Sequence, residues 1–258
     1  MSPRRVVAAI LVRMGSQRLP GKVLGNLAGR PALDWLVRRV RLCPGIDDVV
    51  VGTSVRPEND IIEQFCAASG IACFRGPECD VAARLLGLLD AHRATVGVNV
   101  FGDEPLIDPA VIALLLERFG DGAEWDFVGN DLATTYPPGM DAEVFSVAAF
   151  RHAVEACDDP AVREHSTLCL RRRPDLFRLL NVEAPSHQRR PELELELDTE
   201  EDQVVVEAIF DHFAGHDDFS LDDIITFLDR NPDLRRHNAT VVRRWKTFRI
   251  ASIDNAAF

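Results

Sequence analysis

Residues 6–22 read VVAAILVRMGSQRLPGK, and this stretch decides the fold. It opens with seven apolar residues rich in β-branched types, which is typical of a strand buried on both faces of a parallel sheet. A polar loop with two glycines follows, and its basic residues are Arg13, Arg18 and Lys22. Ligands of open α/β sheets bind at the carboxyl ends of the strands, so the loop is predicted to wrap a polyphosphate.

The spacing of this loop excludes two common phosphate-binding motifs. A P-loop requires G-x-x-x-x-G-K followed by Ser or Thr, but five residues separate Gly15 from Gly21, and Val23 follows Lys22. The dinucleotide motif G-x-G-x-x-G is also absent. The loop is therefore not the P-loop of an ATPase.

Strand and helix patterns alternate along the rest of the chain. Further strands are predicted at residues 48–53, 71–74, 96–101, 125–128, 142–147 and 192–198. Helices are predicted at residues 31–42, 58–69, 80–92, 109–119, 148–157, 200–214 and 220–229. This alternation predicts an α/β fold with a doubly wound, mostly parallel sheet in a three-layer α/β/α arrangement.

One domain is expected to span residues 1–258. Within it, the periodicity weakens over residues 158–191, where prolines and charges accumulate. That segment is predicted to leave the core as an arm, a lid or a dimerisation insertion. Residues 215–258 are expected to form a C-terminal helical extension.

Composition narrows the classes of function. The net charge of −12 argues against nucleic acid or an anionic membrane as the main partner. No apolar stretch approaches the roughly 20 residues that a membrane span needs. The six cysteines are scattered without C-x-x-C pairs or metal-ligand spacing, which is typical of a reduced, cytoplasmic protein.

Two acidic residues lie at predicted strand ends far apart in the chain. Asp103 follows the strand at residues 96–101 in the run GDEPLI, and Asp198 ends the strand at residues 192–198 in the run LDTEED. Carboxylates in such places suit Mg²⁺, which takes one or two of them together with phosphate oxygens. Alternatively, Asp103 is a turn former, and Asp198 or Thr199 caps the helix that follows.

These motifs together resemble a known family. The loop is similar to R-M-G-S-x-R-L-P-G-K of the cytidylyltransferases that make CMP-activated acidic sugars, in the SpsF-like spore-coat polysaccharide branch, and all nine specified positions match. GDEPLI is similar to the family's G-D-x-P-L-I, and residues 198–202 to its metal-binding D-T-x-E-D segment. The resemblance covers nearly the whole chain. It implies a Rossmann-like nucleotidyltransferase fold, CTP as a substrate, Mg²⁺ as cofactor and a homodimer.

The resemblance also implies roles for individual residues. Expected catalytic residues are Arg13, Lys22, Asp103 and Asp198, with Asp103 and Asp198 holding Mg²⁺. Expected nucleotide-binding residues are Arg13, Met14, Gly15, Ser16, Arg18, Lys22, Arg75, Arg84 and Asp103. The two arginines at 75 and 84 come from a segment similar to F-R-G-x-x-x-D-V-L-x-R, in which Ala82 replaces leucine.

The expected acceptor-binding residues are Tyr136, Asp141, Glu143, Arg163 and His165. The segment at 138–145 is similar to the family's P-x-G-x-D-V-E-V-F, and that at 163–167 to its R-E-H-x-T. The carboxylates would accept hydrogen bonds from acceptor hydroxyls or an amine, while the histidine would bind an anionic acceptor or assist proton transfer. Without the resemblance, the first segment is also typical of an ordinary turn into a strand, and the second is also typical of charges on a helix surface.

The predicted reaction transfers CMP from CTP to a small anionic acceptor, such as a sugar acid or a phosphonate, with release of pyrophosphate. The alternative is a nucleotide-sugar-dependent glycosyltransferase of polysaccharide biosynthesis, but its D-x-D metal motif is missing at Gly102–Asp103–Glu104. A degenerate, non-catalytic nucleotide-binding subunit would be expected to have lost Lys22, Asp103 or Asp198. Uridylyl- and guanylyltransferases usually carry a G-G pair in the first loop, and this chain does not.

Overall fold

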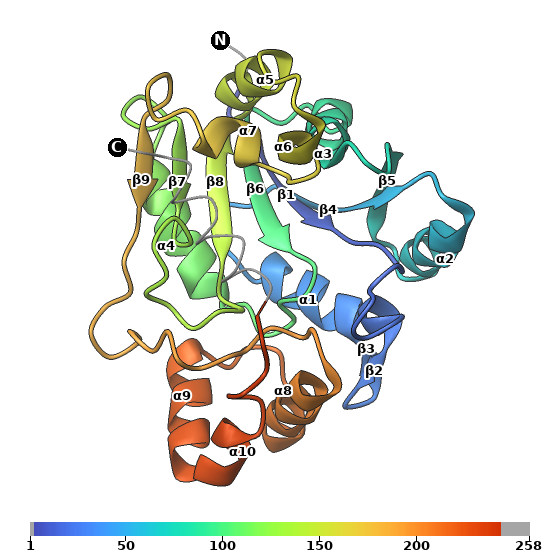
Figure 1. The fold of residues 1–258 in the computed structure, drawn as a ribbon, viewed down its shortest axis with the longest axis vertical. Helices are drawn as coiled ribbons and strands as arrows, with labels where there is room; N and C mark the ends of the chain where they lie inside the picture. The colour runs from blue at the N-terminus through green and yellow to red at the C-terminus, as the bar shows by residue number, and fades with distance from the viewer. Residues whose placement is uncertain (1–2, 244–258) are drawn as a thin grey trace.

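Strand β1 (Val6–Leu11) lies inside a seven-stranded sheet with helices on both faces (Figure 1). The computed structural model describes residues 3–243. The strands of the sheet are, in spatial order, β5 (Ala72–Gly76), β4 (Asp48–Ser54), β1, β6 (Val96–Phe101), β8 (Ala142–Ser146), β7 (Phe127–Gly129) and β9 (Leu179–Asn181). The first four run parallel, β8 runs antiparallel to β6 and β7, and β9 runs parallel to β7. The predicted doubly wound, mostly parallel sheet is thereby confirmed.

Helices cover both faces of the sheet, and the last three helices of the described chain lie together beyond one end of it (Figure 1). Their bounds are α1 (Ala32–Arg41), α2 (Asp60–Ala68), α3 (Val81–Ala91), α4 (Pro109–Phe119), α5 (Val147–Glu155), α6 (Pro160–Arg163), α7 (Leu168–Arg171), α8 (Glu200–His212), α9 (Leu221–Arg230) and α10 (Pro232–Arg236). Short 3-10 turns form η1 (Lys22–Leu24) and η2 (Pro57–Asn59), and a small hairpin pairs β2 (Asn26–Leu27) with β3 (Arg30–Pro31). No helix within residues 3–243 combines the length and apolar character needed to span a bilayer.

The side chains of β1 alternate between two hydrophobic cores. Ala8 and Ile10 pack in the core that includes α1 and α4, whereas Val7 and Ala9 pack in the core that includes α3 and α5. A strand with helices on both faces must be apolar at every position, which explains the unbroken apolar run in the sequence. The strands β1, β4, β5 and β6 consequently end at one edge of the sheet, where the loops after them meet.

Local capping agrees with the helix starts expected from sequence. Asp108 accepts a hydrogen bond from the amide of Ala110 at the start of α4, and Ser220 forms a capping box with Asp223 at the start of α9. Asp80 caps α3 in the same way, through the amide of Ala83. These caps satisfy amides that have no partner within the helix.

The strand predicted at residues 192–198 is wrong. Its leucines are buried as the alternation required, but the segment is an extended connection outside the sheet. Its backbone makes isolated hydrogen bonds, from Leu195 N to Pro138 O (2.8 Å) and from Leu197 N to Asp103 O (2.7 Å), instead of a ladder. The opposite face is not solvated either, since the Glu194 side chain is also buried. The alternation therefore predicted the buried leucines correctly, but it did not show whether the segment pairs with another strand.

Residues 158–191 depart from the core less than predicted. The short helices α6 and α7 contribute Val162 and Leu170 to one core, and β9 forms the edge of the main sheet. The weak periodicity reflects elements of only three or four residues each. The extension predicted at 215–258 is helical in α9 and α10, and its part after residue 243 lies outside the described residues.

The Gly139→Ala variant should have a free energy of unfolding about 3 kcal/mol or more below that of the wild type. Gly139 has a φ of 100°, and a Cβ there would lie 2.5 Å from the Leu195 carbonyl carbon, a backbone atom that cannot move away cheaply. Urea unfolding measures the loss. Gly29→Ala is the matched control, since it has a φ of 86° but open space around its Cβ, and should cost only about 1 kcal/mol. Equal losses in the two variants would contradict the close contact.

Candidate active site

Lys22 brings together two carboxylates from distant parts of the chain. It begins η1 after Gly21, which has a φ of 75°, and it is one of two lysines in the chain. Its Nζ lies 2.9 Å from Asp198 Oδ1 and 3.3 Å from Asp103 Oδ2. Arg18 forms an ion pair with the other oxygen of Asp198. Four residues that the sequence predicted to act together therefore meet at the carboxyl edge of the sheet.

Hydrogen bonds to the backbone hold the two segments that carry these carboxylates in place. The carbonyl of Asp103 accepts the amide of Leu197 at 2.7 Å, which fixes the extended segment against the end of β6. Asp198 immediately precedes Thr199, the N-cap of α8, whose capping box is completed by Asp202. The Asp202 carboxylate also accepts the amide of Asp198 at 3.1 Å. Thr199 and Asp202 therefore cap the helix, and the Asp198 side chain is left to pair with Lys22.

The basic loop is anchored by residues that lie outside its motif. The amide of Met14 donates to Asn59 Oδ1 at 2.8 Å, and Asn59 Nδ2 donates to Ser54 Oγ at 2.7 Å. Arg13, half of whose side chain is exposed, pairs with Glu78 at 3.3 Å. Asn59 is almost fully buried, so its side chain is committed to this task. Sequence analysis missed these three anchors because none of them carries a motif.

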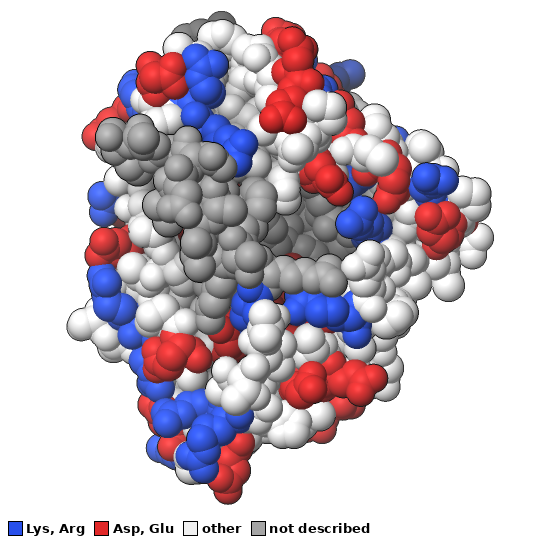
Figure 2. Space-filling view, in the orientation of Figure 1, with Lys and Arg blue, Asp and Glu red and all other residues white. Residues whose placement is uncertain are grey.

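Within the loop itself the backbone turns tightly. The amide of Ser16 donates to the Met14 carbonyl at 2.9 Å, so that Gly15 lies at the tip of a small turn. A Cβ on Gly15 would meet nothing within 4 Å, so the tip faces open space. Figure 2 shows a row of basic side chains across the middle of one face of the molecule, with acidic side chains close to it.

The two other predicted nucleotide-binding arginines lie apart from the Lys22 cluster. Arg75 pairs with Asp60 at 2.7 Å and with Glu63 at 2.9 Å on α2. Arg84 is buried and donates to the carbonyl of Pro77 at 2.6 Å, which fixes the turn that carries Glu78. Burial lowers the pKa of Arg84. A direct contact of either arginine with a nucleotide stays a prediction.

Asp141 belongs to a second group of carboxylates, which sequence analysis did not recognise. Oxygens of Glu104, Asp141 and Glu196 all lie within 4.8 Å of one another, and the amide of Asp141 donates to Glu104 at 3.1 Å. Burial and the carboxylates of Asp103 and Asp141 raise the pKa of Glu196 to about 8. Burial and Asp141 also raise the pKa of Glu104. In the sequence, this group was indicated only by the closeness of Glu104 to Asp103 and of Glu196 to Asp198.

The structure does not place the other expected acceptor residues in this group. Tyr136 is buried, and the Glu143 side chain is fully enclosed, accepting hydrogen bonds from Asn99 (2.7 Å) and Thr167 (2.8 Å). Arg163 pairs with Asp80 at 2.7 Å, and His165 lies exposed between α6 and α7. For Glu143 and Arg163 the geometry supports roles in holding elements together, and direct acceptor contact stays a prediction.

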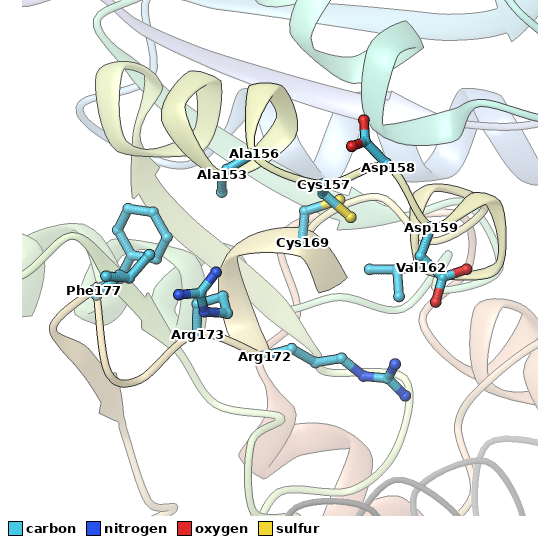
Figure 3. Close-up of a pocket in the computed structure, with 11 residues that line it drawn as sticks. Ala153, Ala156, Cys157, Asp158, Asp159, Val162, Cys169, Arg172, Arg173 and Phe177 are labelled. Atoms are coloured by element: carbon cyan, nitrogen blue, oxygen red, sulfur yellow. The ribbon is translucent and has the colours of Figure 1, made fainter.

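A cavity lies in another part of the molecule, away from the Lys22 cluster. It has a volume of about 260 Å³ and lies among α5, α6, α7 and the turn after them, lined by Cys157, Cys169, Arg172 and Phe177 among others (Figure 3). Neither Lys22 nor its two carboxylates line this cavity. The candidate site is therefore defined by its converging charges.

The donor set fits a magnesium ion. Asp103 and Asp198 offer hard carboxylate oxygens, and both already contact a single cation, the Lys22 ammonium. Mg²⁺ is commonly bound by one or two carboxylates plus phosphate oxygens, and the loop beside them is the predicted phosphate site. The same edge of the sheet thus joins a basic loop and a carboxylate pair, which is the arrangement of a nucleotide-binding enzyme.

Comparisons with known proteins identify the class. A family model described as cytidylyltransferase matches residues 7–227. SpsF, a spore coat polysaccharide biosynthesis protein of Bacillus subtilis (strain 168), is 34% identical over 235 residues, covering 88% of this chain and 95% of that protein. A 3-deoxy-manno-octulosonate cytidylyltransferase of Anaeromyxobacter dehalogenans (strain 2CP-C) is 33% identical over 180 residues, covering 63% and 71%.

A solved structure agrees with this result. A cytidylyltransferase from Leptospira borgpetersenii serovar Hardjo-bovis (strain JB197) has a TM-score of 0.85 at 27% identity, and the match covers 93% of this chain and 100% of that one. The fold and the site define a nucleotidyltransferase. The chain belongs to the cytidylyltransferase family. This membership favours nucleotidyl transfer over the alternative of glycosyl transfer.

The Glu143→Gln variant should gain stability relative to the wild type as the pH rises. Burial and Asp131 raise the pKa of Glu143 from 4.5 to about 7, against the opposing effect of Arg171. Since the folded state holds the proton more tightly than the unfolded state, this group lowers the wild-type free energy of unfolding between pH 4.5 and 7. The difference in Tm, variant minus wild type, should therefore rise across that window and level off above it.

Altered hydrogen bonds in this variant add a constant offset, which leaves the slope unaffected. Glu155→Gln, at an exposed carboxyl, is the control and should give a flat difference. A flat difference for Glu143→Gln as well would contradict the raised pKa.

Proposed function

We propose that this protein is a Mg²⁺-dependent cytidylyltransferase that transfers CMP from CTP to an acidic sugar or a similar anionic acceptor and releases pyrophosphate. The observation that carries the proposal is the convergence of Lys22, Arg18, Asp103 and Asp198 at the carboxyl edge of the sheet. In-line attack of an acceptor oxygen on the α-phosphorus needs charge stabilisation and positioning, and these residues can provide both. Relatives named 3-deoxy-manno-octulosonate cytidylyltransferase support the choice of reaction.

The basic loop is the part of the site that would hold the triphosphate. Carboxylates compensate the positive charges of Lys22 and Arg18 in the structure. This pairing allows both side chains to be partly buried and holds each in a defined orientation. On binding, phosphate oxygens would take the place of one carboxylate partner of each cation. The same cations would then stabilise the charge that develops on the pyrophosphate leaving group.

Asp103 and Asp198 would hold the magnesium ion. When bound, that ion supplies charge neutralisation at the α-phosphate and favours the ionised form of the attacking oxygen. The hydrogen bond between the Asp103 carbonyl and the Leu197 amide holds together the two backbone segments that carry these carboxylates. The two segments therefore already lie side by side before substrate binds.

The carboxylate group of Glu104, Asp141 and Glu196 lies next to the proposed metal ligands and would border the acceptor. Burial and the neighbouring carboxylates raise the pKa of Glu196, so this group favours a bound proton or an added cation. Ionised carboxylates of the group would accept hydrogen bonds from acceptor hydroxyls. Compensation of the acidic charge by the magnesium ion would allow an anionic, hydroxyl-rich acceptor to bind beside these residues.

CTP with Mg²⁺ should raise the Tm by about 5–10 °C at a hundredfold excess over its Kd, because a ligand that binds only the folded state stabilises it by mass action. A thermal-shift series with CTP, UTP, GTP and ATP, each with Mg²⁺ or with a chelator, measures this. Only CTP should give the large, Mg²⁺-enhanced shift. A shift with nucleotide sugars and none with CTP would contradict the proposal.

The Lys22→Ala variant should bind CTP roughly 10–100-fold more weakly, since a hydrogen bond to a charged group contributes about 1.5–3 kcal/mol. Isothermal titration calorimetry with CTP and Mg²⁺ measures the change. Arg30→Ala is the control, because Arg30 pairs with Asp34 on the nearby hairpin and helix and is exposed. Unchanged affinity in Lys22→Ala would remove the loop from the triphosphate site.

A further inference from the structure

The buried carboxylate of Asp202 connects Asp198 to the C-terminal part of the chain. Asp202 lies in the first turn of α8 and is fully buried. Its Oδ2 accepts the amide of Asp198 at 3.1 Å and the amide of Thr199 at 2.9 Å. The position of the Asp198 backbone is therefore set by whatever fixes this carboxylate.

Two side chains from the C-terminal segment fix it. Arg243, 2% exposed, donates from one guanidinium nitrogen to Asp202 Oδ2 at 2.9 Å and from the other to Oδ1 at 2.7 Å. Asn238 donates to the same Oδ1 at 2.8 Å and to the carbonyl of Glu194 at 3.0 Å. The fork geometry of arginine matches both oxygens of a carboxylate, so this contact defines the orientation of the Asp202 side chain.

The same segment reaches the basic loop. Arg18, which pairs with Asp198, also donates to the carbonyl of Val242 at 3.1 Å. Neighbouring residues 242 and 243 therefore contact the site from two directions, through the loop and through α8. Arg243 also lies 3.3 Å from Glu194, next to the extended segment that carries Asp198.

This support is additional to the part of the chain that the family model matches. The match ends at residue 227, whereas Asn238 and Arg243 lie beyond it. A buried arginine and a buried carboxylate are expensive to remove from water, and the two-point contact between Arg243 and Asp202 offsets that cost. The pairing therefore ties this part of the C-terminal segment firmly to the first turn of α8.

We propose that Arg243 is a positioning residue for Asp198: by holding Asp202, it fixes the Asp198 amide and thus the carboxylate that faces Lys22. The inference rests on the proposed function, in which Asp198 is a metal ligand. Residues that orient a metal ligand from behind typically affect metal affinity 10–100-fold. Arg243 should therefore govern the contribution of the metal to nucleotide binding, and leave nucleotide binding without metal nearly unchanged.

The test compares the Kd of CTP with Mg²⁺ and with a chelator, by calorimetry well below the Tm of each variant. Arg243→Ala should reduce the Mg²⁺-dependent gain in affinity by about 10-fold or more, while the Kd in chelator stays within about twofold. Arg243→Lys should be intermediate, because one ammonium cannot bind both carboxylate oxygens in the arginine geometry. Arg236→Ala, on an exposed residue of α10, is the matched control and should match the wild type.

The outcomes separate the two proposals. If Arg243→Ala does not fold, Arg243→Lys decides the question, with a reduced Mg²⁺-dependent gain expected in a folded protein. A wild-type gain retained in these variants, or equal losses with and without Mg²⁺, would show that Arg243 only anchors the segment and would overturn the inference. If the wild type itself binds CTP without any gain from Mg²⁺, the proposed metal site fails, and the positioning role fails with it.

Discussion

The contact of one ammonium group with two carboxylates is the constraint on which the site depends. Lys22, Asp103 and Asp198 are all partly shielded from water, and the single ammonium group offsets charge on both carboxylates only while all three side chains stay in place. Parallel pairing of β1 with β6 brings the first two together, because both follow the ends of neighbouring strands. The third arrives on an extended segment that the Asp103 carbonyl holds by one hydrogen bond. A lysine suits the position because its compact charge fits between two carboxylates, whereas the planar guanidinium of arginine is better suited to bind both oxygens of one carboxylate.

Acidic residues are concentrated around this contact in excess of the nearby cations. Glu104, Asp141 and Glu196 lie beside Asp103, and burial, together with repulsion from Asp103 and Asp141, raises the pKa values of Glu104 and Glu196. Such an arrangement is costly in the folded state unless cations or protons compensate it. The physical consequence is a site that favours added positive charge, which is consistent with the proposed magnesium ion.

Residues outside the motifs provide most of the geometry. The loop has the charges, but Asn59 and Glu78 hold its backbone and its first arginine. Asp198 has a charge, but Asp202 holds its amide. Glu143 shows the converse, because a residue inside a motif is fully enclosed and joins β6, β8 and α7 through Asn99, Thr167 and Arg171. A motif therefore identifies where chemistry takes place more reliably than it identifies what each side chain does.

The sequence by itself determined the parallel sheet, the positions of its main helices and the convergence of Lys22 with Asp103. Apolar runs, capping residues and strand ends are local features, and the carboxyl ends of parallel strands necessarily meet at one edge. Only the tertiary structure showed that residues 192–198 lie outside the sheet, since alternating burial does not reveal whether a neighbour is a strand. It alone also placed Glu104 with Glu196, and Asp202 with Arg243, because such pairings join residues far apart in the sequence and depend on how the elements pack.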